Sequence, residues 1–283
     1  MMKNVIWIIL GVLLFAGGLI FSFDRKGNFS NSEDYSYTID AKWKLPDILE
    51  EVSGIEWIGN NKIACVQDED GVIFIYNLSS SKIEREIKFA GPGDYEGIAI
   101  DDKTAYVLRS DGSIFKVQQF QSSKPTIDKI DTFLTEDQNV EGLCLDKKNS
   151  RLLLALKDKD FIKEDFKGVY AFDLSENILL ERPVFELDLK DDLLSESGNK
   201  LSKRLRPSEI EIHPNSSEIY ILDAKAPKLL ILDLLGNIKK IYKLDEDEFS
   251  QPEGISFTTD GTLYISNEAG WEDANILKVK LNN

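Results

Sequence analysis

Histidine, cysteine and positive charge are all scarce in this sequence. Its 283 residues include one histidine and two cysteines, and 34 lysines and arginines stand against 50 aspartates and glutamates. The single histidine, His213, lies in the turn-like segment HPNSS, where we expect a surface loop residue rather than a catalytic base. This scarcity argues against the hydrolases that depend on a histidine base.

The two cysteines, Cys65 and Cys144, lie in apolar, strand-like runs of separate segments. Their spacing resembles no thiolate metal site. We expect two buried thiols, which behave as small hydrophobic groups, rather than a disulfide.

The shortage of positive charge leaves a formal net charge of -16. A surface this acidic repels phosphate backbones, so we expect no nucleic-acid partner. The chain also lacks a G-x-S-x-G elbow, a Walker loop and a dinucleotide fingerprint, so no short motif identifies a reaction.

An apolar N-terminal run is the first positive feature of the chain. Residues 5–23 form 19 consecutive uncharged positions, enough for a helix to span a hydrocarbon core of roughly 30 Å. A cleaved secretory signal is the alternative, but its apolar region is usually shorter, about 7–15 residues. We therefore expect an anchor or signal-anchor over residues 1–24, a polar tether over 25–36 and a folded domain over 37–283.

A short motif recurs through the folded domain. Its clear copies are Glu96-Gly97-Ile98, Glu141-Gly142-Leu143 and Glu253-Gly254-Ile255, and its weaker copies are Ser53-Gly54-Ile55 and Ser208-Glu209-Ile210. The copies are separated by 43, 45, 67 and 45 residues. A period of this size indicates a repeat architecture.

Each copy opens a unit that reads as four antiparallel strands. In the second unit the strands are expected over residues 96–100, 104–110, 114–120 and 126–134, with Asp111-Gly112 supplying a tight turn. Four strands in about 45 residues are typical of a propeller blade. The last unit ends after three strands, and residues 37–45 can supply its fourth. We predict an all-β, five-bladed propeller; a six-bladed ring would need one more unit, which the sequence does not reveal.

The 67-residue third unit keeps four strands, the last over residues 182–189, and carries its surplus in two loops. The loops are residues 157–167 and 190–207. The second loop is long and charged, and its role as a lid, a partner-binding feature or a plain insertion stays open.

Polar residues are expected to converge at one end of the central channel. The first motif positions of all five units fall there because the first strand of each blade lines the channel: Ser53, Glu96, Glu141, Ser208 and Glu253. The ends of the second strands lie at the same end: Gln67, Asp68, Arg109, Lys157, Asp223, Asn267 and Glu268. Convergent polar groups in a concavity are the default hypothesis for a binding site.

Three interpretations of this cluster remain open. Glu96, Glu141, Glu253, Asp223 and Asn267 offer oxygen ligands suited to calcium. The same groups could support metal-assisted hydrolysis with a carboxylate as base. In the third interpretation the glutamates pair with Arg109, Lys157 and backbone amides, because buried charges need partners, and they lock the blades together.

The glycine that follows each glutamate has a structural explanation, since close approach of backbones selects glycine. In the fourth copy Glu209 takes the place of this glycine. Whether Glu209 substitutes for the missing first-position glutamate stays open.

The segments SGIEW, YEGIAI, VEGLCL, RPSEIEIHP and QPEGISFTTDGTLYISNE together resemble the SdiA-regulated, or YjiK-like, family of bacterial propeller proteins, over residues 42–281. The resemblance implies a single-pass protein of the bacterial cytoplasmic membrane, held by residues 5–23, with an NHL-like propeller on the extracytoplasmic (periplasmic) side. Lactonase-like propellers hold a metal through Glu, Asn and Asp at the channel mouth, and Glu96, Asp223 and Asn267 are the counterparts by position. The family supplies no established reaction.

Taken together, these features predict a membrane-anchored propeller that binds a cation, calcium in particular, or a small ligand at the channel mouth. Catalysis as a calcium-dependent lactonase or phosphoesterase is one alternative. A protein-interaction scaffold that uses residues 190–207 is the other.

Overall fold

The computed structural model describes residues 37–163, 165–196 and 205–282, which form five β-sheets. The expected anchor over residues 1–24 and the tether over 25–36 lie outside this range. Within the described residues, no helix has the length and apolar character needed to cross a membrane.

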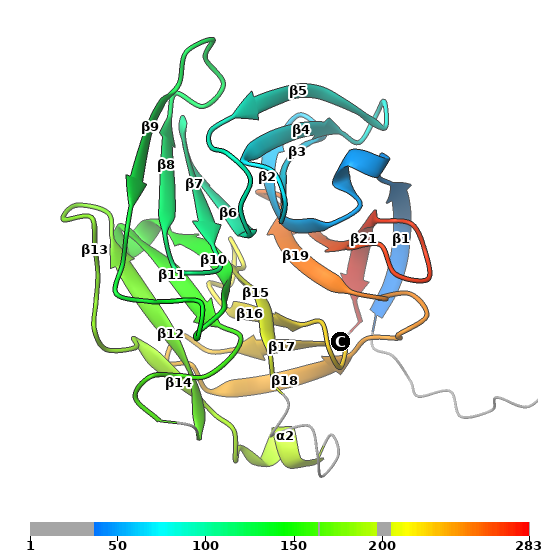
Figure 1. Cartoon of the computed structure of the whole chain (residues 1–283). Helices are drawn as coiled ribbons and strands as arrows, with labels where there is room; N and C mark the ends of the chain where they lie inside the picture. Colours follow the sequence, from blue (N-terminus) through cyan, green and yellow to red (C-terminus); the bar gives the residue numbers. More distant parts are fainter. Residues whose placement is uncertain (1–36, 164, 197–204, 283) are drawn as a thin grey trace, which may run out of the picture. The chain divides into compact units, whose positions relative to one another are not determined.

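Blades 1 and 2 are four-stranded sheets in which each strand pairs antiparallel with the next (Figure 1). Blade 1 contains β2 (Val52–Gly59), β3 (Lys62–Gln67), β4 (Val72–Asn77) and β5 (Lys82–Lys88). Blade 2 contains β6 (Tyr95–Asp101), β7 (Thr104–Arg109), β8 (Ile114–Gln118) and β9 (Thr126–Ile130).

Blade 3 departs from the regular pattern at its outer edge. It contains β10 (Val140–Asp146), β11 (Arg151–Leu156), β12 (Phe166–Asp173), β13 (Ile178–Leu179) and β14 (Phe185–Asp188). The predicted fourth strand over residues 182–189 is β14, but β13 also pairs with β12, so two short strands share this edge. The 3₁₀ turn η3 (Lys147–Asn149) precedes β11, and the five-residue helix α2 (Asp192–Glu196) follows β14.

Blades 4 and 5 complete the set, and blade 5 joins the two ends of the described domain. Blade 4 contains β15 (Pro207–Ile212), β16 (Ile219–Asp223), β17 (Lys228–Leu232) and β18 (Ile238–Lys243). Blade 5 contains β19 (Pro252–Phe257), β20 (Leu263–Asn267), β21 (Asn275–Leu281) and β1 (Tyr37–Lys44), which is followed by the 3₁₀ turn η2 (Asp47–Leu49). Because β1 pairs with β21, the predicted closure and the five-bladed ring are confirmed.

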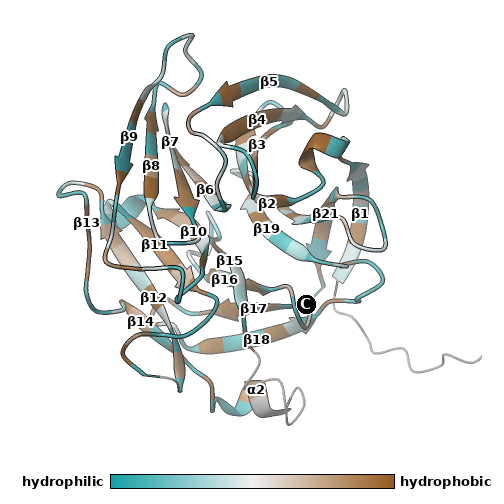
Figure 2. Cartoon of the chain, viewed as in Figure 1, coloured by the Kyte–Doolittle hydropathy of each residue, from teal (hydrophilic) through white to brown (hydrophobic). Residues whose placement is uncertain are grey.

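Apolar side chains collect between neighbouring blades. One cluster joins Val66 and Ile75 of blade 1 to Ile98 and Val107 of blade 2, and a similar cluster lies between blades 3 and 4. Middle strands are therefore buried along most of their length and largely hydrophobic, as the brown segments of β4 show (Figure 2). The outer strand β9 is mostly exposed and carries Asp128 and Lys129, as expected for a strand at a sheet edge.

The two cysteines are buried free thiols, as predicted. His213 lies in the predicted turn, between β15 and β16, but its ring is only partly exposed because it packs against Tyr220 and Phe257. The sequence interpretation of His213 as a simple surface residue missed this packing.

Candidate functional site

Every inner strand contains a β-bulge at the first position of the repeated motif. In β6, Tyr95 pairs with Arg109 and Gly97 pairs with Leu108, which leaves Glu96 without an opposite residue. The same irregularity occurs in the other four inner strands, and the five bulged residues are Ser53, Glu96, Glu141, Ser208 and Glu253. A bulge re-aims a side chain locally and is frequent beside functional sites. We call these five residues the mouth ring.

The glycine after four of the five ring residues allows inner strands to approach closely, as predicted. A Cβ atom on Gly97 would lie 2.8 Å from Leu143 Cβ and 3.1 Å from the Glu141 carbonyl oxygen, and one on Gly54 would lie 2.9 Å from Gly97 Cα. Contacts this short are not tolerated between real carbon atoms. The motif therefore repeats for a packing reason in addition to any chemistry of its glutamate.

Glu209, which replaces this glycine in blade 4, has a different role. Its Oε1 accepts hydrogen bonds from the Leu143 amide at 2.7 Å and the Ile210 amide at 2.8 Å. Glu209 is buried and connects blades 3 and 4. The ring residue of blade 4 is therefore Ser208, and the question left open by the sequence is answered.

The two ring serines connect neighbouring blades through backbone carbonyls. Ser53 Oγ donates to the Tyr95 carbonyl at 2.6 Å, and Ser208 Oγ donates to the Pro252 carbonyl at 2.9 Å. Tyr95 and Pro252 directly precede Glu96 and Glu253. Each serine thus holds the bulge that carries the next ring glutamate.

Glu141 has one occupied and one unoccupied carboxylate oxygen. Lys157, which follows β11, forms an ion pair with Oε1, and Asn139 Nδ2 donates to the same atom at 3.0 Å. Oε2 is buried and has no hydrogen-bond partner among the described residues. Because an unsatisfied buried acceptor is costly, this oxygen is a candidate contact for a ligand.

The three ring glutamates lie within each other's electrostatic field. Burial, together with the charges of Glu141 and Asp94, raises the pKa of Glu96 to about 10. Burial and the charge of Glu253 raise the pKa of Glu141 to about 8. Burial raises the pKa of Glu253 to about 7, although Lys157 opposes the shift. The ring therefore carries protons near neutral pH, which is frequent at functional sites.

Further carboxyl groups surround the ring on the blade 5 and blade 1 side. Burial and a hydrogen bond with Glu51 raise the pKa of Glu268 to about 9. Burial and the charge of Glu51 raise the pKa of Asp68 to about 6, and Asp68 Oδ1 is buried without a partner in the described structure. Sequence reasoning missed Glu51 and Asp94 because they lie in connections between blades, where positions do not repeat.

Two of the predicted ring partners have local roles instead. Arg109 pairs with Asp111 of its own hairpin, with Nε at 3.0 Å from Oδ1, so the third interpretation was wrong in pairing Arg109 with a ring glutamate. Gln67 Oε1 accepts hydrogen bonds from the backbone amides of Glu69 and Asp70 and so stabilises the turn after β3.

The two remaining predicted ligands differ in how fully they are bonded. Asp223 is fully buried, pairs with Lys228 and accepts a hydrogen bond from the Arg206 amide at 3.0 Å. Asn267 Nδ2 donates to Asn275 Oδ1 at 2.9 Å, but Asn267 Oδ1 is buried and unpartnered in the described parts of the chain. Asn267 therefore keeps an available oxygen and Asp223 does not.

Comparison of the sequence with profiles of known protein families assigns the chain to one family. The family profile described as SdiA-regulated matches residues 29–270. The chain belongs to the SdiA-regulated family. A search of curated proteins gave no match.

Solved structures with a similar fold include enzymes and a protein of unknown function. Glutaminyl cyclase from Myxococcus xanthus is 13% identical with a TM-score of 0.61, and the match covers 87% of this chain and 96% of that one. Aldose sugar dehydrogenase from Streptomyces coelicolor, in its PQQ-bound form, is 12% identical with a TM-score of 0.51, and the match covers 87% of this chain and 98% of that one. A protein of unknown function from Bacteroides thetaiotaomicron is 13% identical with a TM-score of 0.52, and the match covers 87% of this chain and 72% of that one. At these identities the likeness shows the fold alone.

A second tier of inner-strand residues lies three positions after the mouth ring: Glu56, Ala99, Cys144, Glu211 and Ser256. Ser256 Oγ donates to Glu56 Oε2 at 3.2 Å. Burial raises the pKa of Glu211 to about 8, and burial with the charge of Glu211 raises the pKa of Glu56 well above its usual range. Sequence reasoning missed this tier, although the fourth position of the aligned motif copies would have revealed it.

Proposed function

We propose that this SdiA-regulated family member is a binding protein whose mouth ring takes up a small cation, with calcium as the first candidate. The observation that carries the proposal is a set of buried oxygen atoms without donors: Glu141 Oε2, Asn267 Oδ1 and Asp68 Oδ1. They come from blades 3, 5 and 1. With Glu141 and Asp68 ionised all three are acceptors, so a cation that displaces the carboxyl protons, or a ligand N–H group, satisfies them.

The charge balance around the ring supports a cation over an anion. Arg109 and Lys228 are bound to Asp111 and Asp223. Arg206 binds Asp158 through a terminal nitrogen, while its Nε is buried without a partner among the described residues. Lys157 faces the ring glutamates, and although burial opposes the shift, Glu253 and Glu141 hold its pKa above its ordinary value. A concave acidic surface concentrates cations.

The oxygen-rich chemistry of the ring fits calcium, which prefers carboxylate and amide oxygens. Within the described residues, no group of three or more His, Cys, Asp or Glu side chains is placed to hold a metal ion. In the described structure the ammonium group of Lys157 occupies the position beside Glu141 that a cation would take. Binding of calcium by Glu141, Glu253 and Asn267 would therefore replace the ammonium group of Lys157.

The cellular setting is part of the same proposal. The apolar run over residues 5–23 and the family resemblance support a single-pass anchor with the propeller on the extracytoplasmic side. A calcium-dependent hydrolase and a scaffold acting through residues 190–207 stay predictions, and residues 197–204 of that loop lie outside the described part of the chain.

Thermal unfolding with and without calcium tests the proposal. At about 100 times the dissociation constant, calcium stabilises a one-site protein by about 2.7 kcal/mol, which raises Tm by about 5 °C or more. Glu141→Gln should abolish this rise, and Glu86→Gln, on an exposed position of the outer strand β5, should retain it. An unchanged Tm of the parent protein with calcium, magnesium and a chelator would overturn the proposal.

A further inference from the structure

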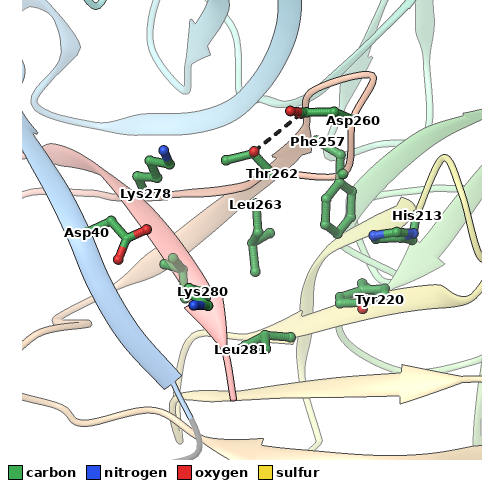
Figure 3. A pocket seen from close by; sticks show the side chains of 12 residues that line it. Asp40, His213, Tyr220, Phe257, Asp260, Thr262, Leu263, Lys278, Lys280 and Leu281 are labelled. Carbon is green, nitrogen blue, oxygen red and sulfur yellow. Dashed lines mark hydrogen bonds between the residues drawn. The ribbon is translucent and has the colours of Figure 1, made fainter. Parts of the chain in front are cut away.

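A separate cavity of about 400 Å³ lies between blades 4 and 5 (Figure 3). Its lining includes Phe257, at the opposite end of β19 from the ring residue Glu253. The cavity is thus distinct from the mouth ring. Its volume is within the range of about 300–1,000 Å³ that small-molecule sites occupy.

One side of the cavity is aromatic. The rings of His213 and Tyr220 stack with centroids 5.8 Å apart, and Phe257 meets His213 edge-on at 4.9 Å and Tyr220 at 5.0 Å. Leu263 lies between these rings and the charged side of the cavity (Figure 3). Such a wall suits a flat, apolar ring, which aromatic side chains bind by stacking or edge contacts.

Hydrogen bonds fix the tautomer of His213 in the cavity wall. Its Nδ1 accepts from the backbone amides of Asn215 at 3.3 Å and Ser216 at 3.1 Å, which places the ring proton on Nε2. A Cβ atom on Gly261 would lie 2.9 Å from Nε2, so the turn at Gly261 packs directly against the imidazole ring.

The opposite side of the cavity carries charges of both signs. Asp40, Lys278 and Lys280 line it, and none of them forms an ion pair within the described residues. By contrast Lys42 and Lys44, further along the same strand pair, bind Glu272 and Asp273.

The position of Asp40 is set by a bulge in β1. Ile39 pairs with Val279 and Ala41 with Lys278, so Asp40 has no opposite residue. A second carboxylate, Asp260, is already engaged by the hydroxyl groups of Thr258 and Thr262. Both bonds go to Oδ1 of Asp260, whereas Asp40 has no ion pair or side-chain hydrogen bond of this kind among the described residues.

From these features we infer that the cavity binds a free aromatic amino acid as its zwitterion. The side-chain ring packs against Phe257 and Tyr220, the carboxylate faces Lys278 and Lys280, and the ammonium group faces Asp40. The ligand supplies a direct ion-pair partner for each of these three side chains. This inference is independent of the cation site.

Calorimetric titration with tryptophan and three analogues tests the inference. Tryptamine lacks the carboxylate, indole-3-propionate lacks the ammonium group, and N-acetyltryptophanamide lacks both charges and stands for a residue inside a peptide. Because each exposed ion pair contributes about 0.2–1 kcal/mol, tryptophan should bind about two- to fivefold more tightly than either singly charged analogue, and the amide should bind most weakly. Equal binding of all four, tighter binding of any analogue, or no heat from tryptophan would overturn it.

Charge-removing variants assign the two ends of the ligand. Asp40→Asn should weaken tryptophan binding to the level of indole-3-propionate and leave the latter unchanged. The double variant Lys278→Gln/Lys280→Gln should reduce tryptophan to the level of tryptamine, while the control Lys88→Gln on β5 changes nothing. All of these positions except Lys278 are exposed, and far-ultraviolet circular dichroism confirms that each variant folds. Parent-like tryptophan affinity in both site variants contradicts the assignment.

Discussion

Lys157 forms its ion pair with Glu141 inside blade 3, and the second carboxylate oxygen of Glu141 has no partner among the described residues. This pair does not connect two blades. Other residues connect the inner strands, among them Ser53, Ser208 and Glu209 through their bonds to neighbouring backbones. The charge of Glu141 is thus not needed to join the blades, which favours a binding role for it.

The close approach of inner strands predicts a selective cost at the motif glycine. Gly97→Ala should reduce the free energy of unfolding by about 1–3 kcal/mol, because the new methyl group meets Leu143 Cβ at 2.8 Å. Gly91→Ala is the matched control, since a Cβ there has no atom within 4 Å. Urea denaturation of both variants measures the difference, and equal stabilities would refute the packing explanation of the motif.

The buried pair of Lys228 and Asp223 predicts a large loss when one partner is removed. Both side chains are almost fully buried, so Lys228→Met leaves an uncompensated charge and should cost about 3–5 kcal/mol. Lys239→Met breaks the pair with Glu218, in which the lysine is 53% exposed, and should cost less than about 1 kcal/mol. Chemical denaturation gives both numbers. A small loss for Lys228→Met would show that Asp223 is satisfied by its backbone donors alone.

The raised carboxyl pKa values predict that stability falls between pH 5 and pH 8. Burial raises the pKa of Glu211 to about 8 and that of Glu253 to about 7 in the folded protein. Above the ordinary glutamate pKa of about 4.3, the folded state therefore binds more protons than the unfolded state, and stability decreases as pH rises. The stabilisation from these two protonated glutamates is fully present below about pH 4.3, the ordinary glutamate pKa, and is lost as pH rises through the raised pKa of the folded state.

Thermal unfolding across this pH range checks the sign. Tm should be higher at pH 5 than at pH 8, and Glu211→Gln, which cannot ionise, should reduce the slope. Glu86→Gln on the exposed part of β5 should leave the slope unchanged. A Tm that increases steadily from pH 5 to pH 8 would contradict the raised pKa values.

The architecture was predictable from the sequence because one packing solution repeats. The spacing of the motif predicted the five inner strands. The extra strand predicted at residues 37–45, which belongs to no repeat unit, predicted the closure by β1. The split edge of blade 3 was not predictable, since β13 and β14 are short strands whose pairing with β12 depends on the loop between them.

The candidate site was predictable in its residues but not in its contacts. Glu96, Glu141 and Glu253 follow from the motif, whereas the bulge that displaces them appears only once the register with the second strand is known. Likewise, Arg109 and Asp111 are two residues apart in a tight turn. Their ion pair directs the Arg109 side chain to Asp111 and not to the ring glutamates.

Calcium titration of Lys157→Met by calorimetry tests the central claim most directly. Removing the ammonium group leaves Glu141 without its cation, so calcium should bind the variant about tenfold more tightly than the parent protein, a difference of about 1.4 kcal/mol. Calcium should also restore the Tm that the substitution lowers. The result that contradicts the claim is a destabilised variant that gives no heat with calcium and whose Tm calcium does not restore. It would show that the ring carboxylates only pair with Lys157 and do not bind calcium.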